Sequence, residues 1–180
     1  MNKLLGVLVL ALSLAGAGCS QVDLSKALSV TDVFTGYYHV GVVDEINNKM
    51  VPSVTFKLAN VGDTAVSRVQ LMVGFWQVGA DGLELDSKQI EGVGPTALEP
   101  GASTEALLVR SEKGYTLSIE APREQMFENS VFRDVTVKLF ARRDGRLVSL
   151  GEFPVERRLI PSASTGAPTA VPDVPVAPVP

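Results

Sequence analysis

The sequence is poor in the residues on which most catalytic and metal sites depend. Its 180 residues include one cysteine, one histidine and one tryptophan, and the formal net charge is −4. A single cysteine cannot form an internal disulfide, so a folded domain must be held together by its hydrophobic core. A mildly acidic chain also lacks the clustered basic face of a nucleic-acid-binding protein, so we expect no nucleic-acid partner.

The common kinds of catalytic site find no support in the residue pattern. His39, the only histidine, lies in a strand-like segment and has no nucleophile and orienting group that would complete a triad. The chain has too few cysteine and histidine residues for a zinc site. Its paired carboxylates fit solvated strand faces better than a glycosidase cleft. We therefore expect no enzyme, no cofactor and no metal, and turnover lost in His39→Ala would reverse that expectation.

Only one long hydrophobic run is present, and it lies at the amino terminus. Lys3 supplies a basic start, residues 4–14 are mostly apolar, and small residues follow up to position 18. This order is typical of a secretory signal peptide. A membrane-spanning helix is the alternative, but it needs about 20 apolar residues, and here Gly16 and Gly18 interrupt the run.

The end of this segment, Ala17-Gly18-Cys19, resembles the lipobox of bacterial lipoproteins. The resemblance implies a signal peptide over residues 1–18 and lipidation of Cys19 by diacylglycerol and a fatty acid such as palmitate. Gly16 departs from the family pattern, which usually has leucine there. Two or three acyl chains would suffice for a stable membrane anchor. Ser20 in place of aspartate implies an outer-membrane lipoprotein that faces the periplasm or the cell surface.

From Tyr37 onward, apolar residues alternate with polar ones, as in half-buried antiparallel strands. The pattern predicts seven short strands, over residues 37–45, 53–58, 69–76, 83–90, 103–110, 135–142 and 147–159, the last bent at Pro154. Turn residues separate them, at Asn47-Asn48, residues 60–63, Asp81-Gly82, Pro100-Gly101 and residues 143–145. The prediction is an all-β fold, an immunoglobulin-like antiparallel β-sandwich, with one short helix over residues 123–128.

Composition divides the chain into four parts. After the signal peptide, residues 19–33 read as a lipid-anchored linker, partly helical around residues 24–28, and residues 34–160 as the sandwich domain. Residues 161–180 are rich in proline and alanine and have no aromatic residue. Such a tail buries too little apolar surface to fold, so we expect it to be disordered. It is a spacer, a ligand for a proline-binding groove, or a tail without a role.

A second resemblance covers roughly residues 52–110. The order of elements there is similar to FxLYD-type and related immunoglobulin-like domains of secreted bacterial proteins. The resemblance implies an adhesive or structural role and carries over no catalytic residue. Its elements are a strand ending at Asn60, a Gly62-Asp63 turn, a strand ending in Phe75-Trp76, the Asp81-Gly82 turn and Leu98-Glu99-Pro100-Gly101.

Aromatic and basic side chains are the best candidates for contacts with a partner. Trp76 should face outward, unless residues 111–130 cover it, and either Tyr37 or Tyr38 should face outward too. Two basic pairs, Arg142-Arg143 and Arg157-Arg158, would lie near each other if the last two strands form a hairpin, either against an acidic partner or as a solvated edge. The candidate partner contacts are Trp76, Tyr37, Tyr115, Arg157 and Arg158.

These patterns together predict a lipid-anchored cell-envelope protein that binds or scaffolds another envelope protein without catalysis. The membrane would be contacted through acylated Cys19. The alternative is recognition of a glycan, peptidoglycan or a small ligand by an aromatic face, for which an exposed Trp76 would be the mark.

Overall fold

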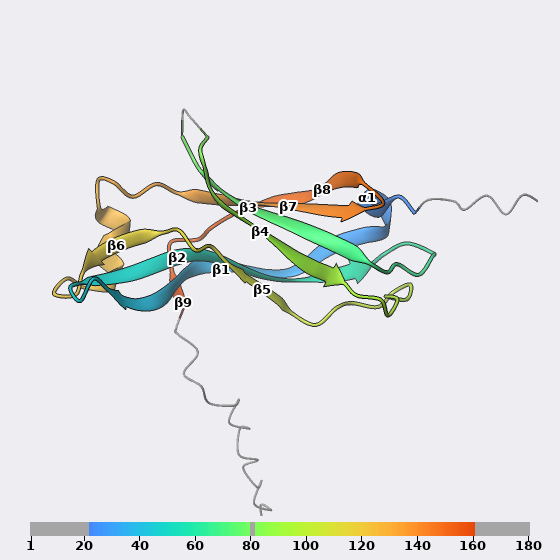
Figure 1. Cartoon of the computed structure of the whole chain (residues 1–180), viewed down its shortest axis with the longest axis horizontal. Coiled ribbons are helices and arrows are strands. Elements are labelled where there is room, and N and C mark those ends of the chain that lie inside the picture. Colours follow the sequence, from blue (N-terminus) through green and yellow to red (C-terminus); the bar gives the residue numbers. More distant parts are fainter. Residues whose placement is uncertain (1–21, 80–81, 161–180) are drawn as a thin grey trace, which may run out of the picture.

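The computed structural model describes residues 22–79 and 82–160, and in it two β-sheets pack face to face in an elongated sandwich (Figure 1). This confirms the predicted all-β sandwich of mainly antiparallel strands. The predicted signal peptide, Cys19, Asp81 and the tail over residues 161–180 lie outside the described residues.

The first sheet has the strand order β5-β2-β1-β9, and β6 also pairs with β2, beyond the end of β5. Its long strand β1 has 16 residues and spans about 50 Å at about 3.3 Å per residue. All pairings are antiparallel except that of β1 with β9. The strands are β1 (Leu28–Val43), β2 (Asn47–Asn60), β5 (Leu107–Arg110), β6 (Tyr115–Ser118) and β9 (Leu159–Ile160).

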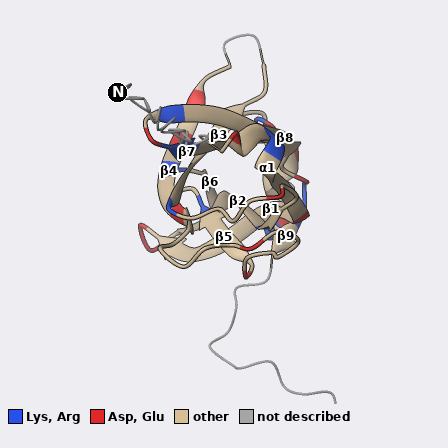
Figure 2. Ribbon diagram, turned by 90° about the vertical axis from the view of Figure 1, so that its right-hand side faces the viewer, with Lys and Arg blue, Asp and Glu red and all other residues tan. Residues whose placement is uncertain are grey.

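The second sheet has the order β4-β3-β7-β8 and lies above the first in the end-on view of Figure 2. Helix α1 (Leu24–Ala27) lies at one end of the sandwich, and the 3-10 helix η1 (Arg123–Glu128), predicted over these residues, lies beside β6 at the other (Figure 1). No helix within residues 22–79 and 82–160 is long and apolar enough to span a membrane. The strands are β3 (Val69–Gln77), β4 (Glu84–Val93), β7 (Val135–Arg143) and β8 (Arg146–Pro154).

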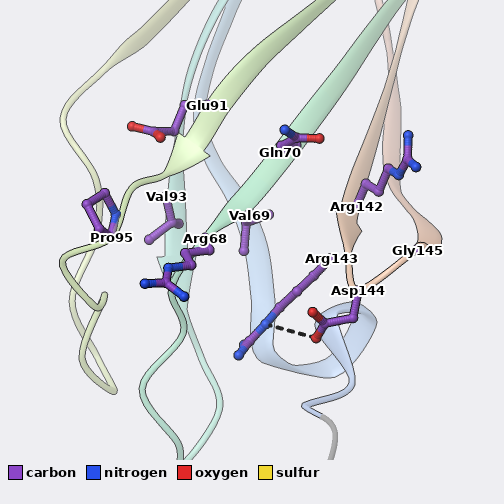
Figure 3. A pocket seen from close by; sticks show the side chains of 10 residues that line it. All are labelled: Arg68, Val69, Gln70, Glu91, Val93, Pro95, Arg142, Arg143, Asp144 and Gly145. Atoms are coloured by element: carbon purple, nitrogen blue, oxygen red, sulfur yellow. Dashed lines mark ion pairs between the residues drawn. The ribbon is translucent and has the colours of Figure 1, made fainter.

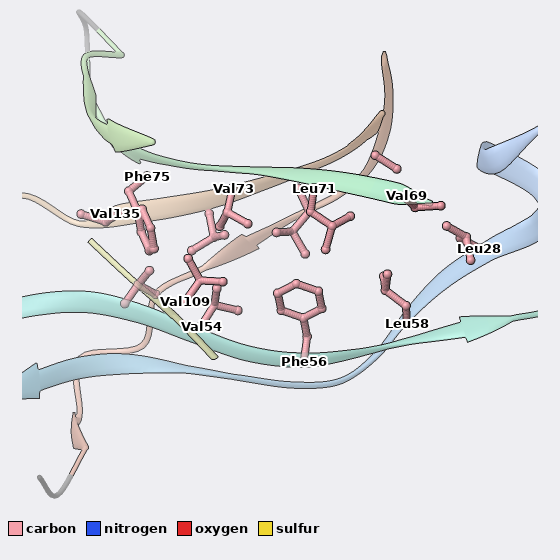
Figure 4. Packing of buried hydrophobic residues seen from close by; sticks show 14 of the residues in the cluster. Leu28, Val54, Phe56, Leu58, Val69, Leu71, Val73, Phe75, Val109 and Val135 are labelled. Carbon is pink, nitrogen blue, oxygen red and sulfur yellow. The ribbon is translucent and has the colours of Figure 1, made fainter. Parts of the chain in front are cut away.

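The core fills the space between the sheets and follows the predicted alternation. The apolar side chains that point inward at alternate positions of β2, β3 and β7 are at most 1% exposed. Each contributes about 1.5–3 kcal/mol by leaving water, which lets the domain fold without a disulfide. These inward residues include Val137 and Leu139 of β7. Figure 4 shows the others: Val54, Phe56 and Leu58, then Val69, Leu71, Val73 and Phe75, and finally Val135.

The fold begins earlier in the chain than the pattern predicted. Residues 24–33, expected in the linker, form α1 and the first part of β1. Leu24, Ala27 and Leu28 are at most 6% exposed and belong to the core. A register shift between Thr31 and Phe34 interrupts the pairing of β1 with β2 and hides the alternation in the sequence. The predicted boundary at residue 34 is therefore wrong.

The last predicted strand, residues 147–159, is two strands in different sheets. β8 ends at Pro154, whose nitrogen cannot donate to a ladder, and the chain then crosses to the first sheet, where β9 pairs with Tyr37 and Tyr38. The β7–β8 hairpin forms, but its turn holds Arg143 while its open end holds Pro154. Because Arg157 and Arg158 follow the open end, the expected proximity of the two basic pairs is wrong.

Two turn predictions had different outcomes. Asp144 and Gly145 have φ of 50° and 79° between the paired Arg143 and Arg146, as a two-residue hairpin turn requires. The Asn47-Asn48 turn is wrong, because both residues pair within β2 and the chain reverses at residues 44–46. The predicted strand over 103–110 is also shorter, since only residues 107–110 form β5.

Candidate interaction surface

A groove on the outer face of the first sheet lies where the strand pairing along one edge of β2 is interrupted. β5 pairs with residues 53–56 of β2 and β6 with residues 47–50, which leaves Pro52 between them. Pro52 has no N–H for a ladder, and its carbonyl accepts a hydrogen bond from the Ser111 N–H at 3.0 Å. Residues 111–114 connect β5 to β6 along the same edge of β2 and bulge away from it here. A Cβ on Gly114 would overlap the Met50 carbonyl oxygen, so this close approach to β2 requires glycine.

Asp86, from β4 in the second sheet, holds this bulged segment. Its Oδ2 accepts hydrogen bonds from the Glu112 N–H at 2.7 Å and from the Ser111 hydroxyl at 3.1 Å, and Oδ1 accepts from the Ser87 N–H at 2.9 Å. Burial raises the pKa of the Asp86 carboxyl, but these hydrogen bonds and the charge of Lys88, 3.9 Å away, outweigh burial and leave the pKa below its ordinary value. One carboxylate thus ties the segment to the other layer of the sandwich.

The bulged segment forms one wall of a groove with a volume of about 670 Å³. Strands β1, β2 and β5, together with Lys88 of β4, supply the rest of its lining. Its apolar and aromatic lining residues are Tyr38, Val40 and Val51, and its cations include Lys49, Arg110 and Lys113.

Two arginines extend over this outer face from opposite edges, and each stacks on an aromatic ring of β1. Arg110, on edge strand β5, reaches across β2 and places its Cζ 3.5 Å from the Tyr38 ring centroid. Arg158, just before β9, places its Cζ 3.6 Å from the Phe34 centroid. Gly36 leaves room between the rings, since a Cβ there would lie 3.1 Å from Arg158 Cγ.

Apolar side chains accompany these stacks. Phe34, Val40 and Leu108 are 43%, 54% and 50% exposed. The pairing of Phe34 with Thr55, and of Thr55 with Leu108, places Phe34 and Leu108 in one row across the sheet. Exposed aromatic and arginine side chains beside apolar ones have the composition of interface centres. We call this surface, made by Phe34, Tyr38, Val40, Leu108, Arg110 and Arg158, the outer patch.

The predicted contact Tyr37 does not belong to it. Strand alternation turns Tyr37 inward, where it is 0% exposed, and turns Tyr38 outward. The Tyr37 ring packs against Phe127 and Phe132 with centroid distances of 5.4 Å to each. Its hydroxyl has no hydrogen-bond partner among the described residues, and burial raises the pKa of this phenol far above its ordinary value. Tyr37 as a partner contact is therefore wrong.

Tyr115 and Arg157 lie near this aromatic cluster. The half-buried Tyr115 donates its hydroxyl hydrogen to the Arg133 oxygen at 2.8 Å and accepts from Gln77 Nε2 at 3.2 Å. Arg157 donates hydrogen bonds from Nε and Nη2 to the Asp134 carboxylate, both at 2.8 Å, and these bonds lower the pKa of Asp134. Both residues have defined structural partners, and their role as partner contacts stays a prediction.

Trp76 is half-buried on the outer face of the second sheet. Its indole lies on Gly74, where a Cβ would come within 2.7 Å of Nε1, and Lys138 Nζ lies 5.4 Å from the ring centroid. The inward neighbour Phe75 is fully buried, so the predicted outward direction of Trp76 is confirmed. Its contact with a partner stays a prediction.

A second depression, of about 490 Å³, lies at the α1 end of the sandwich (Figure 3). Arg143 extends from the β7–β8 turn toward Arg68 in this view, and its Nε lies 3.5 Å from Asp144 Oδ2. Arg142 and Glu91 also line it. Two acids therefore offset most of the charge of three arginines. In the described parts of the chain, no three His, Cys, Asp or Glu residues are grouped to hold a metal.

No protein-family model and no curated protein matches the chain. Two solved structures are similar to it in outline. Northeast Structural Genomics Consortium target SoR45 is 15% identical, with a TM-score of 0.40, over 83% of this chain and 98% of that chain. A protein from Archaeoglobus fulgidus is also 15% identical, with a TM-score of 0.33, over 70% of this chain and 92% of that chain. At these values neither likeness indicates a family or a function.

Proposed function

We propose that this chain is a lipid-anchored protein of the bacterial cell envelope whose sandwich binds or scaffolds another envelope protein without catalysis. The observation that carries the binding proposal is the outer patch, with two arginine–aromatic stacks beside exposed Leu108. The similarity of residues 52–110 to FxLYD-type domains supports an adhesive or structural role. The lipobox resemblance at Ala17-Gly18-Cys19 supports an outer-membrane lipoprotein facing the periplasm or the cell surface.

The distance between anchor and patch supports a role in presenting the patch to a partner. Cys19 is three residues before Val22, so acyl chains on it would hold the α1 end within about 11 Å of the attachment point. Tyr38 is ten residues farther along the chain than Leu28, the first residue of β1, which separates them by about 33 Å. With the long axis of the sandwich directed away from the bilayer, the outer patch around Tyr38 would stand clear of the lipid headgroups and be open to a protein partner.

Two exposed leucines provide a matched test of the patch. Leu108 lies in the outer patch and Leu147 lies on the outer face of the other sheet, and both are 50% exposed. We expect cross-linking in cells to capture one or two envelope proteins with the wild type and with Leu147→Asp, but not with Leu108→Asp. A wild type that captures nothing removes the proposal, and equal loss in both variants excludes the patch as the binding surface.

Recognition of a glycan or peptidoglycan is a second candidate, supported by the half-exposed Trp76 beside Lys138. Trp76 is the only tryptophan, so its emission reports this face alone. Soluble peptidoglycan fragments that bind there should shift or quench this emission. Unchanged emission during demonstrated binding would place the ligand elsewhere on the protein.

A further inference from the structure

The groove beside Tyr38 carries positive charge that no described residue neutralises. Lys49, Arg110 and Lys113 line it, and none of the three has an ion pair with a described residue. The fourth cation of the lining, Lys88, is paired with Glu112. On a chain with a net charge of −4, such a local surplus favours a negatively charged ligand at this place.

Arg110 is the cation best prepared for a carboxylate. Its guanidinium has no ion pair with a described residue and stacks on Tyr38. Its Nε–H is buried and lacks an acceptor among the described residues, so the terminal Nη groups are the donors that a ligand would reach. A guanidinium offers five N–H donors in a planar fork that matches a carboxylate. Because stacking on Tyr38 already orients this plane, less side-chain freedom is lost when a carboxylate binds.

The remaining lining suits a peptide better than a small anion. Tyr38 and the 54% exposed Val40 place apolar surface next to the cations. The groove continues into the outer patch, where Leu108 and Phe34 are also exposed. A protein segment with acidic and apolar side chains would complement both the charge and the apolar surface, whereas an inorganic anion would complement only the charge.

We infer that this groove binds an acidic segment of the partner protein, with an aspartate or glutamate carboxylate paired with Arg110 and neighbouring acids near Lys49 and Lys113. This rests on the proposed function, because it names the chemistry of the partner segment for the same surface.

The test uses the mature acylated protein in detergent and two fluorescein-labelled ten-residue peptides, one of alternating glutamate and glycine and one of alternating glutamine and glycine. Anisotropy should show that the glutamate peptide binds at least about tenfold more tightly, as expected for a charge-assisted hydrogen bond. Arg110→Gln should lose this preference. Arg110→Lys should keep only part of it, because an ammonium lacks the planar fork.

Arg142→Gln is the matched control, since it removes the same charge from an exposed arginine at the α1 end. It should bind the glutamate peptide like the wild type. Equal binding of the two peptides, or equal loss in Arg110→Gln and Arg142→Gln, would overturn the inference. Binding of polygalacturonate without binding of the glutamate peptide would overturn it in favour of an acidic glycan. A single cooperative urea unfolding transition in each variant checks that the fold is intact.

Cross-linking in cells separates this inference from the proposed function. A partner captured equally by the wild type and by Arg110→Gln would overturn the acidic segment and leave protein binding intact. A wild type that captures no partner would instead remove the proposed function, whatever the peptides show.

Discussion

The guanidinium of Arg110 reaches across β2 and stacks on Tyr38 of β1, with Cζ 3.5 Å from the ring centroid. Ser53 lies beneath this path and is fully buried, and its hydroxyl donates to the Gly36 carbonyl at 3.1 Å. Small side chains at Ser53 and Gly36 thus leave a shallow track for the long side chain. The stack joins the edge of the sheet to its centre and sets the shape of the groove.

A double-mutant cycle should measure this stack. Tyr38→Leu and Arg110→Met each remove one partner while keeping an apolar side chain of similar length. We expect a coupling free energy of about 0.5–1 kcal/mol from urea unfolding, which is the usual size of a cation–π interaction at an exposed site. Additive single effects would mean that the stack contributes nothing to stability.

The two tyrosines of the aromatic cluster should respond in opposite ways to loss of the hydroxyl. Tyr37→Phe removes a buried hydroxyl without a partner, so the free energy of unfolding should stay the same or rise. Tyr115→Phe removes a hydroxyl with two hydrogen bonds and should lower it by about 1 kcal/mol. Urea unfolding followed by Trp76 emission measures both. A clear loss of stability in Tyr37→Phe would reveal a partner for its hydroxyl.

The faces of the central strands were predictable from the sequence because a regular strand repeats every two residues. Once Phe75 is assigned to the core, Trp76 must face outward, and no tertiary information is needed. The same logic could not choose between Tyr37 and Tyr38, because β1 has register shifts on either side of them, after Thr31 and after His39. When the alternation is interrupted at both ends of a segment, the neighbouring residues do not reveal which of its side chains face the core.

Most of the outer patch could not have been found by the same means. Arg158 was a candidate, but Tyr38 and Arg110 are 72 residues apart, and no local pattern links them. Pro52 within a strand was the available signal, since it marks a place where a neighbouring strand must break. The role of Arg157 with Asp134 was equally hidden, because it depends on the chain changing sheets after Pro154.

Stability should fall at acidic pH through Asp86. Its folded-state pKa lies below the ordinary value, so its contribution is complete above the unfolded-state pKa, near 4, and is lost as pH falls through the lower folded-state pKa. The pKa of Asp134 is lowered too and should add in the same direction. Urea unfolding between about pH 7 and pH 2 should show a decline that begins below about pH 4.

Substituting Asp86 tests whether this carboxylate causes the loss of stability at acidic pH. Asp86→Asn should lower the free energy of unfolding at pH 7 by about 1–3 kcal/mol, because hydrogen bonds to a charged acceptor become weaker, and should flatten the acidic decline. Asp44→Asn is the control, since Asp44 is exposed in a turn with a φ of 50° that asparagine tolerates well. An acidic decline unchanged in Asp86→Asn would show that other carboxylates cause it.

The anchor is tested by exchanging the sulfur of Cys19 for a hydroxyl. Cys19→Ser leaves residues 22–160 untouched and removes the thiol on which the predicted diacylglycerol would be carried. We expect the wild type to fractionate with the outer membrane at an intact mass that includes acyl chains, because one chain alone binds a bilayer only marginally and two or three bind it stably. Cys19→Ser should lose the acyl mass and leave that fraction.

Ser20→Asp, which keeps the thiol, is the matched control for sorting and should remain acylated but move to the inner membrane. A wild type that is released from membranes without detergent and carries no acyl mass would end the proposal of a lipid anchor, since the chain would then need another way to stay at a membrane.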